Sequence, residues 1–193
     1  MRGVFSVVIP TISGREESLA RCIKSYEATS PSNVDIVVIQ DAPNWPTACN
    51  RGYLEAEFDV IHFTADDLEA TAGWHEEAVE HCVTRNELPA PVVLDHSIDG
   101  PWNNRYDGEN GALTHFTRIP LMTRDQYERI GPWPEIPYSS DVWLSMKART
   151  LGIPTRMIHS YRFIHHWSQV GRIDTPENLE YSENQLKWLV AQL

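Results

Sequence analysis

Near its start the chain reads Phe5-Ser6-Val7-Val8-Ile9-Pro10, an apolar and largely β-branched run that predicts a buried strand. Two similar runs follow, at residues 36–39 (Ile-Val-Val-Ile) and 59–64 (Asp-Val-Ile-His-Phe-Thr). Apolar residues with helical spacing follow the first run, beginning at a capping-box pattern at Ser13. They also follow the third run, from about Gly73. Near-continuous apolar strands that alternate with helices indicate a parallel sheet covered on both faces. We therefore expect an α/β fold.

Acidic residues follow two of these strands. Asp41 comes after the second run, and Asp66 and Asp67 come after the third. The carboxyl ends of parallel strands meet at one edge of the sheet, where ligands of such folds bind. Carboxylates gathered there repel one another unless a cation or a hydrogen-bonded ligand joins them. The sequence Asp66-Asp67-Leu68-Glu69 suits a hard divalent cation, although a solvated acidic turn has the same composition.

The second half of the sequence is less regular. A further strand is predicted at residues 91–94, and residues 95–111 are rich in Gly, Asn and Asp. Such a long loop either orders over a ligand as a lid or is a flexible insertion. The elements expected beyond it are a capped helix from Thr123 to Gly131, a helix from Ser139 or Ser140 to Gly152, an extended segment at 155–166 and a last helix from Pro176. No linker or repeat divides the chain, so we expect a single domain over residues 1–193.

Composition excludes several classes of protein. The formal net charge of -11 argues against a non-specific nucleic-acid binder, which needs a basic surface. The three cysteines are widely spaced and form no CxxC pair, so neither a disulfide framework nor a cysteine zinc site is indicated. No apolar stretch approaches the roughly 20 residues that cross a bilayer. We expect a cytoplasmic protein that does not enter a membrane.

Several different short motifs follow one another along the chain in a characteristic order. They are residues 7–11 (Val-Val-Ile-Pro-Thr) with Arg15, residues 36–41, residues 48–52 (Ala-Cys-Asn-Arg-Gly), residues 67–69 with Gly73-Trp74, residues 121–124, residues 130–131, residues 140–144 and residues 165–166. This order resembles the family 2 glycosyltransferases, in particular their rhamnosyltransferase-like branch. The resemblance covers about residues 4–172. It implies a GT-A (Rossmann-like) fold with a mainly parallel central sheet flanked by helices. Residues 1–90 would bind the nucleotide sugar, residues 91–172 the acceptor, and residues 173–193 would form a C-terminal helix.

The resemblance also implies roles for individual residues. A nucleoside-diphosphate sugar would be held by Pro10, Thr11, Arg15, Asp41, Asn50 and Asp66. Mn²⁺ or Mg²⁺ would be held by Asp67, Glu69 and His165, with His166 as the alternative to His165. Asp141 would be the general base that deprotonates the acceptor hydroxyl. One base without a protein nucleophile implies inversion at the anomeric carbon.

The sequence departs from the family at two of these places. Asp41 is followed by Ala42-Pro43 where the family often has Asp-Gly-Ser, which leaves the nucleobase open. Ser140 stands where a Glu normally precedes the base.

We expect a metal-dependent, inverting enzyme that transfers a single sugar to a hydroxyl acceptor. The acceptor could be a small molecule, a protein or a modified nucleobase, and the enzyme a monomer or a homodimer. Two alternatives stay open: a nucleotidyltransferase that acts on a sugar phosphate, and a catalytically silent nucleotide-sugar-binding module.

Overall fold

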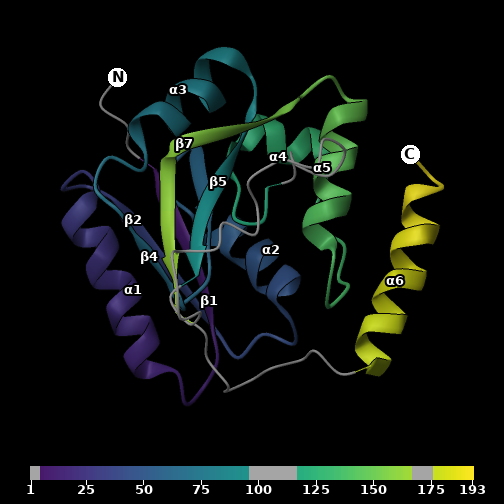
Figure 1. Ribbon diagram of the computed structural model, residues 1–193, viewed down its shortest axis with the longest axis horizontal. Coiled ribbons are helices and arrows are strands. Elements are labelled where there is room, and N and C mark those ends of the chain that lie inside the picture. The colour runs from purple at the N-terminus through teal and green to yellow at the C-terminus, as the bar shows by residue number, and fades with distance from the viewer. Residues whose placement is uncertain (1–4, 96–116, 167–175) are drawn as a thin grey trace.

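The computed structural model describes residues 5–95, 117–166 and 176–193 (Figure 1). The elements are, in chain order, β1 (Ser6–Thr11), α1 (Glu16–Thr29), β2 (Asp35–Gln40), α2 (Trp45–Glu55), β3 (Val60–Phe63), β4 (Leu68–Ala70), α3 (Glu76–Arg85), β5 (Leu88–Asp95), β6 (Leu121–Thr123), α4 (Arg124–Ile130), α5 (Ser140–Thr150), β7 (Thr155–His165) and α6 (Pro176–Val190). The predicted α/β class is confirmed. The long loop predicted at 95–111 lies, from residue 96 onward, outside the described residues.

The described strands form two sheets instead of one. In the first, the order is β2-β1-β3-β6, with β1, β2 and β3 parallel and β6 antiparallel to β3. In the second, the order is β4-β7-β5, and β7 runs antiparallel to β4 but parallel to β5. The turn between β3 and β4 redirects the chain, so β4 pairs with the end of β7 instead of extending the first sheet. A mainly parallel arrangement therefore describes the first sheet only.

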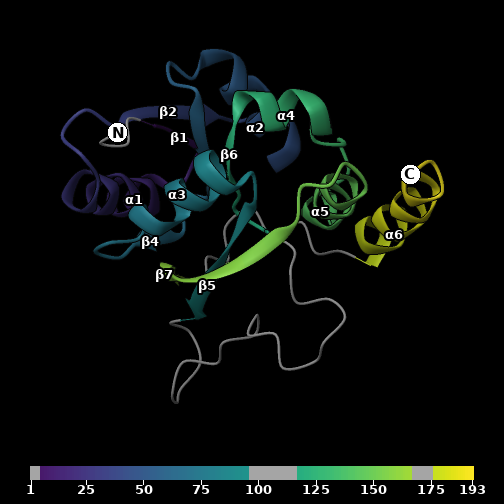
Figure 2. The same ribbon diagram turned by 90° about the horizontal axis from the view of Figure 1, so that it is seen from above.

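Strand β1 lies at the centre of the core, and its side chains alternate between two apolar clusters. Phe5, Val7 and Ile9 pack with residues of α1, α3 and β7. Val8 points the other way and packs with residues of α2, α4 and α5. Figures 1 and 2 show α1 at one end of the molecule and α5 and α6 side by side at the other. Burial on both faces explains why β1 reads as a continuous apolar run.

Helix α2 approaches β1 very closely at Gly52. A Cβ atom built on Gly52 would lie 2.2 Å from Cγ1 of Val8 and 3.0 Å from its Cγ2. Only glycine allows the helix backbone to come this near to the strand. This glycine closes the motif at residues 48–52, so close packing accounts for that position of the motif.

Two predicted helix starts had different outcomes. The capping box at Thr123 is confirmed: its hydroxyl accepts from the backbone N–H of Gln126, whose side chain accepts from the backbone N–H of Thr123. The capping box expected at Ser13 is wrong, because α1 begins at Glu16 and no side chain caps it. The Ser13 hydroxyl instead donates to Asp41 across the loop.

No helix of the described ranges is both long and apolar enough to cross a membrane.

Candidate functional site

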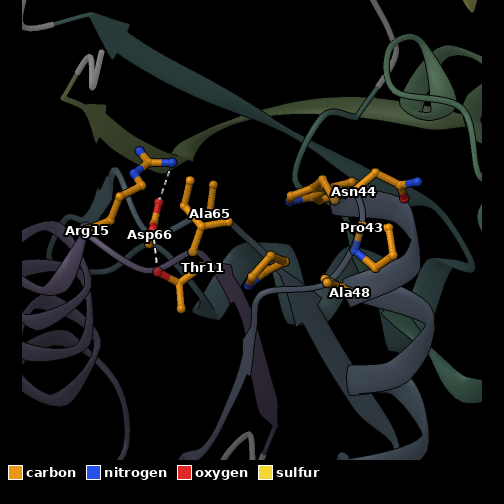
Figure 3. Close-up of a pocket in the computed structure, with 11 residues that line it drawn as sticks. Thr11, Arg15, Pro43, Asn44, Ala48, Ala65 and Asp66 are labelled. Atoms are coloured by element: carbon orange, nitrogen blue, oxygen red, sulfur yellow. Dashed lines mark hydrogen bonds and ion pairs between the residues drawn. The ribbon is translucent and has the colours of Figure 1, made fainter. Parts of the chain in front are cut away.

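A pocket of about 220 Å³ opens at the carboxyl ends of β1, β2 and β3 (Figure 3). It is lined by Pro10, Thr11, Ile12, Arg15, Ala42, Pro43, Asn44, Trp45, Ala48, Ala65 and Asp66. Strand β1 lies between β2 and β3, so the chain winds to one side of β1 and then to the other. A ligand crevice forms at this kind of switch point in open α/β sheets. The sequence prediction placed its site at the same edge.

The pocket has two chemically different ends. Figure 3 shows Thr11, Arg15 and Asp66 at one end and Pro43, Asn44 and Ala48 at the other. The second end is built from the loop after β2 and the first residues of α2. A helix N-terminus carries a partial positive charge, which attracts an anionic group. The pocket thus combines apolar walls with charged or partially charged groups.

The start of α2 is fixed by local hydrogen bonds. The side-chain oxygen of Asn44 accepts from the backbone N–H of Thr47 at 2.9 Å and from its hydroxyl at 2.8 Å. The indole N–H of Trp45 donates to the carbonyl of Thr64 at 2.9 Å, which ties the helix to the end of β3. Sequence reasoning missed this wall. The signal was present, because Asn44 followed by Trp45-Pro46 is a helix start with Pro in the first turn.

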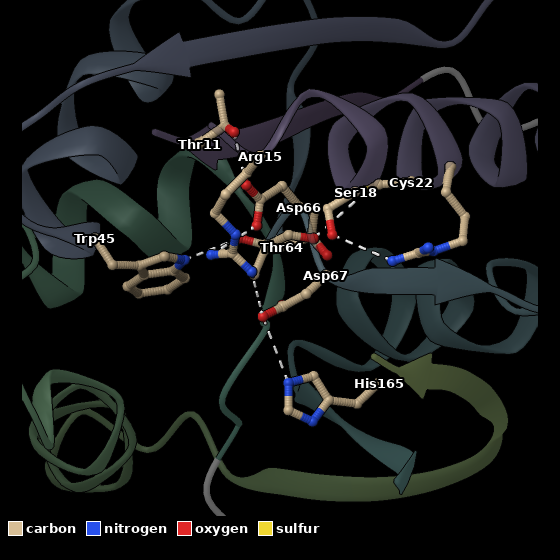
Figure 4. Close-up of polar contacts among 11 residues, drawn as sticks. Thr11, Arg15, Ser18, Cys22, Trp45, Thr64, Asp66, Asp67 and His165 are labelled. Carbon is tan, nitrogen blue, oxygen red and sulfur yellow. Dashed lines mark hydrogen bonds and ion pairs between the residues drawn. The ribbon is translucent and has the colours of Figure 1, made fainter. Parts of the chain in front are cut away.

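A charge cluster begins at the polar end of the pocket, where Arg15 and Asp66 line it, and continues outside the lining to Asp67 and His165 (Figure 4). The fully buried Asp66 accepts a hydrogen bond from the Thr11 hydroxyl at 2.6 Å and lies 3.0 Å from Nη1 of Arg15. The other terminal nitrogen of Arg15, Nη2, lies 2.7 Å from Oδ2 of Asp67. Nε2 of His165 approaches the same oxygen of Asp67 at 3.6 Å. One guanidinium therefore bridges two successive carboxylates, a strong form of ion pairing.

The two aspartates of this cluster differ in acidity. Burial raises the pKa of Asp66, and the hydrogen bond from Thr11 and the charge of Arg15 only partly oppose that. Burial also acts to raise the pKa of Asp67, but His165 and Arg15 together outweigh it, so the pKa of Asp67 is lowered. Asp67 is accordingly the more firmly ionised of the two carboxylates.

The predicted metal ligands divide between two pairs. Asp67 faces His165, whereas Glu69 lies 3.1 Å from Nε of Arg21 and 3.1 Å from Nε2 of His166. Over residues 5–95, 117–166 and 176–193, no three His, Cys, Asp or Glu side chains gather as one metal-binding group. Two ligands held at about 2.1 Å from one ion and roughly at a right angle lie about 3 Å apart. The separation of 3.6 Å between Asp67 and His165 is near this value, and their oxygen and imidazole donors fit a divalent cation.

Asp41 has a different environment from the one predicted. It directly follows β2 with a positive φ of 52°, and its two carboxylate oxygens accept from the backbone N–H and the hydroxyl of Ser13, both at 2.8 Å. These hydrogen bonds lower its pKa. Asp41 is exposed and does not line the pocket, although Ala42 next to it does. It holds the loop after β1 against the end of β2.

Asn50 is not brought to the pocket either. Its side-chain nitrogen donates to the Trp133 carbonyl at 3.0 Å, and its oxygen accepts from the Trp133 backbone N–H at 2.9 Å and from the Tyr127 hydroxyl at 2.7 Å. These bonds engage both polar atoms of the amide. Asn50 thus fastens α2 to the segment after α4.

Asp141 lies in the first turn of α5, outside the pocket lining. Its side chain is 19% exposed, and Oδ2 is 4.0 Å from Nε of Arg118. Burial raises the pKa of Asp141, against the opposing charge of Arg118. A carboxylate with a raised pKa takes up a proton more readily near neutral pH, as a general base must.

A buried polar network adjoins the site and was also missed. His62 is fully buried between two tyrosine hydroxyls, Tyr26 at 2.8 Å from Nε2 and Tyr161 at 2.8 Å from Nδ1. Tyr161 donates to the Ile119 carbonyl, and Tyr26 lies 2.9 Å from the Thr64 hydroxyl. Burial lowers the pKa of His62 to about 3, so the ring is neutral. The network joins α1, β3 and β7, and it includes Thr64, the residue before Ala65.

No protein-family model matches the chain, and no curated protein matches it at a significant level. The geometry of the pocket and of the charge cluster is therefore the basis for a functional assignment.

Proposed function

We propose that this protein is a glycosyltransferase that resembles family 2 and has a single GT-A domain. It transfers one sugar, with inversion, from a nucleoside-diphosphate sugar to a hydroxyl acceptor. One observation carries the proposal: the pocket at the switch point of the sheet has the Arg15–Asp66–Asp67–His165 cluster at its edge.

The two ends of the pocket suit the two halves of such a donor. Pro10, Pro43 and Trp45 offer flat or apolar surface to a heterocyclic base. At the other end, Arg15 offers positive charge to a diphosphate. A neutral apolar ligand would leave the charged end unused, whereas a bare phosphate would leave the apolar walls unused. A nucleotide uses both.

The cluster is also the place for the expected Mn²⁺ or Mg²⁺. Asp67 and His165 would hold the ion. Glu69, the second residue of β4, is the next carboxylate along the chain after Asp67. When bound, such an ion supplies Lewis-acid stabilisation of the charge that develops on a departing diphosphate. Asp66, held by Thr11 and Arg15, keeps the turn between β3 and β4 in place.

Asp141 is the proposed base. Its raised pKa lets it accept the proton of the acceptor hydroxyl as the new glycosidic bond forms. The hydroxyl oxygen attacks the anomeric carbon, the bond to the diphosphate breaks, and the proton passes to the Asp141 carboxylate. A single displacement of this kind inverts the anomeric configuration.

The test is a screen of nucleoside-diphosphate sugars with and without Mn²⁺, read by thermal shift and by mass spectrometry of hydrolysis or transfer. We expect one nucleotide to stabilise the protein in a metal-dependent way and to be turned over slowly. Asp67→Asn should abolish the metal-dependent part, while Asp125→Asn, on the exposed side of α4, should behave like the wild type. Turnover by Asp67→Asn in EDTA at the wild-type rate would refute the metal assignment. Tight binding without any hydrolysis or transfer would instead support a silent binding module.

A further inference from the structure

Arg15 occupies an unusual position for a residue that lines a ligand pocket. It lines the pocket, and its guanidinium at the same time pairs with both Asp66 and Asp67. The oxygen of Asp67 that Arg15 approaches at 2.7 Å is the same Oδ2 that faces His165. A divalent cation shared by Asp67 and His165 would need that oxygen. Two positive groups at one carboxylate oxygen repel each other, so the guanidinium and the ion are competitors.

We propose that Arg15 is a displaceable internal counterion: a divalent cation and its guanidinium are alternative partners of Asp67, and the displaced guanidinium binds the anionic part of the ligand in the adjacent pocket. This inference rests on the proposed function for the identity of the ligand, but the competition itself does not require it. The ion and the nucleotide would thereby be coupled through one side chain.

The local structure allows Arg15 to change partners. Arg15 precedes the first residue of α1, and its side chain makes no capping hydrogen bond, so its movement leaves the helix start intact. Its Nε–H is buried and has no hydrogen-bond partner within the part of the chain that the structure describes. The guanidinium therefore has a donor to spare, next to a pocket that it already lines.

If the Arg15 guanidinium and the cation compete, one substitution should change the affinities for Mn²⁺ and for a nucleoside diphosphate in opposite directions. Arg15→Gln frees Asp67 from its counterion, so Mn²⁺ alone should bind more tightly. The same substitution removes a positive group from the pocket, so a nucleoside diphosphate in the presence of Mn²⁺ should bind more weakly. A charge at this distance commonly alters the affinity of a carboxylate for a cation about tenfold or more. A purely structural role for Arg15 would weaken both ligands together.

The experiment is a calorimetric titration of the full chain with MnCl₂, followed by titrations with UDP, GDP, ADP and CDP in saturating Mn²⁺. For Arg15→Gln we expect the Mn²⁺ dissociation constant to fall about tenfold and that of the preferred diphosphate to rise about tenfold. The matched control is Arg129→Gln, which removes the same charge from the Asp125 pair on α4 and should change either constant less than twofold. If Arg15→Gln does not fold, Arg15→Met serves instead, because it also removes the positive charge while keeping an unbranched apolar side chain, and the same signs are expected.

An unchanged or weakened affinity for Mn²⁺ in a folded Arg15 variant would overturn the proposed competition. Tighter binding of Mn²⁺ with an unchanged affinity for the diphosphate would overturn the second half, the transfer of the guanidinium to the ligand. Tighter binding of Mn²⁺ in a protein that binds none of the diphosphates would support the competition and count against the proposed function.

Discussion

Replacing Gly52 by alanine is the perturbation whose cost follows most directly from the structure. The added Cβ atom would lie 2.2 Å from Cγ1 of Val8, whereas ordinary van der Waals contacts begin at 3.4 Å, so α2 or β1 must move by more than 1 Å. Val8 cannot turn away, because it is fully buried in the cluster that β1 forms with α2, α4 and α5. Overpacking of this kind costs about 1–3 kcal/mol, and the severity of the clash favours the upper value.

A smaller effect opposes this cost. Alanine is better than glycine in a helix interior by about 1 kcal/mol. We therefore expect the free energy of unfolding of Gly52→Ala to fall by about 2 kcal/mol. Urea denaturation followed by circular dichroism measures this change, with Arg51→Ala as the control for helix propensity at the neighbouring exposed position.

A double-mutant cycle identifies the cause. Val8→Ala alone should destabilise the protein because it empties buried volume, but combined with Gly52→Ala it should relieve the clash. The double variant should then be more stable than the sum of the single effects predicts, by at least about 1 kcal/mol. A Gly52→Ala protein as stable as the wild type, or additive effects in the cycle, would refute the close-approach argument.

The remaining predictions concern two buried polar groups. Thr11→Val keeps the shape of the side chain but leaves the buried Asp66 without its 2.6 Å donor; we expect a loss of about 1–3 kcal/mol in urea denaturation, and a loss below the error would contradict the argument. For His62, the folded pKa of about 3 lies below the ordinary value of 6.5, so the unfolded chain binds the extra proton. The neutral His62 ring therefore makes its full contribution to the free energy of unfolding above pH 6.5. That contribution declines by about 1.4 kcal/mol per pH unit as the pH falls towards 3. His62→Gln should lose this part of the pH dependence, and a slope unchanged from the wild type would contradict the assignment.

The elements with strong local patterns could be predicted from the sequence. Strand β1 is a continuous apolar run because both of its faces are covered. Strands β2 and β3 were found from similar runs, although β2 lies at the edge of the sheet and leaves Val38 exposed. The division into two sheets could not be predicted. Strand β4 has only three residues, too few for any periodicity, and its partner in β7 lies about a hundred residues further along the chain.

The candidate site was predictable where strand ends decide it. Thr11 and Asp66 follow or end adjacent parallel strands, and they meet as the topology requires. The direction in which a side chain on a helix points could not be predicted in this way. Nothing in residues 48–52 shows that Asn50 turns towards Trp133 instead of the pocket, because that depends on contacts with α4 and the segment after it. Similarly, the Ser13 side chain could cap a helix or bind Asp41, and tertiary contacts select the second.

The charge cluster draws its members from both sheets. Asp66 and Asp67 leave the first sheet at the end of β3, whereas His165 ends β7 in the second sheet. The two sheets are separate hydrogen-bonded ladders, and β4 contributes only three residue pairs to the second. Tyr161 and Phe163 of β7 nevertheless pack in the same apolar cluster as Val7 and Ile9 of β1, so loosening of β7 would also open the core beside the first sheet. The distance between His165 and Asp67 therefore reports on how the two sheets pack against each other.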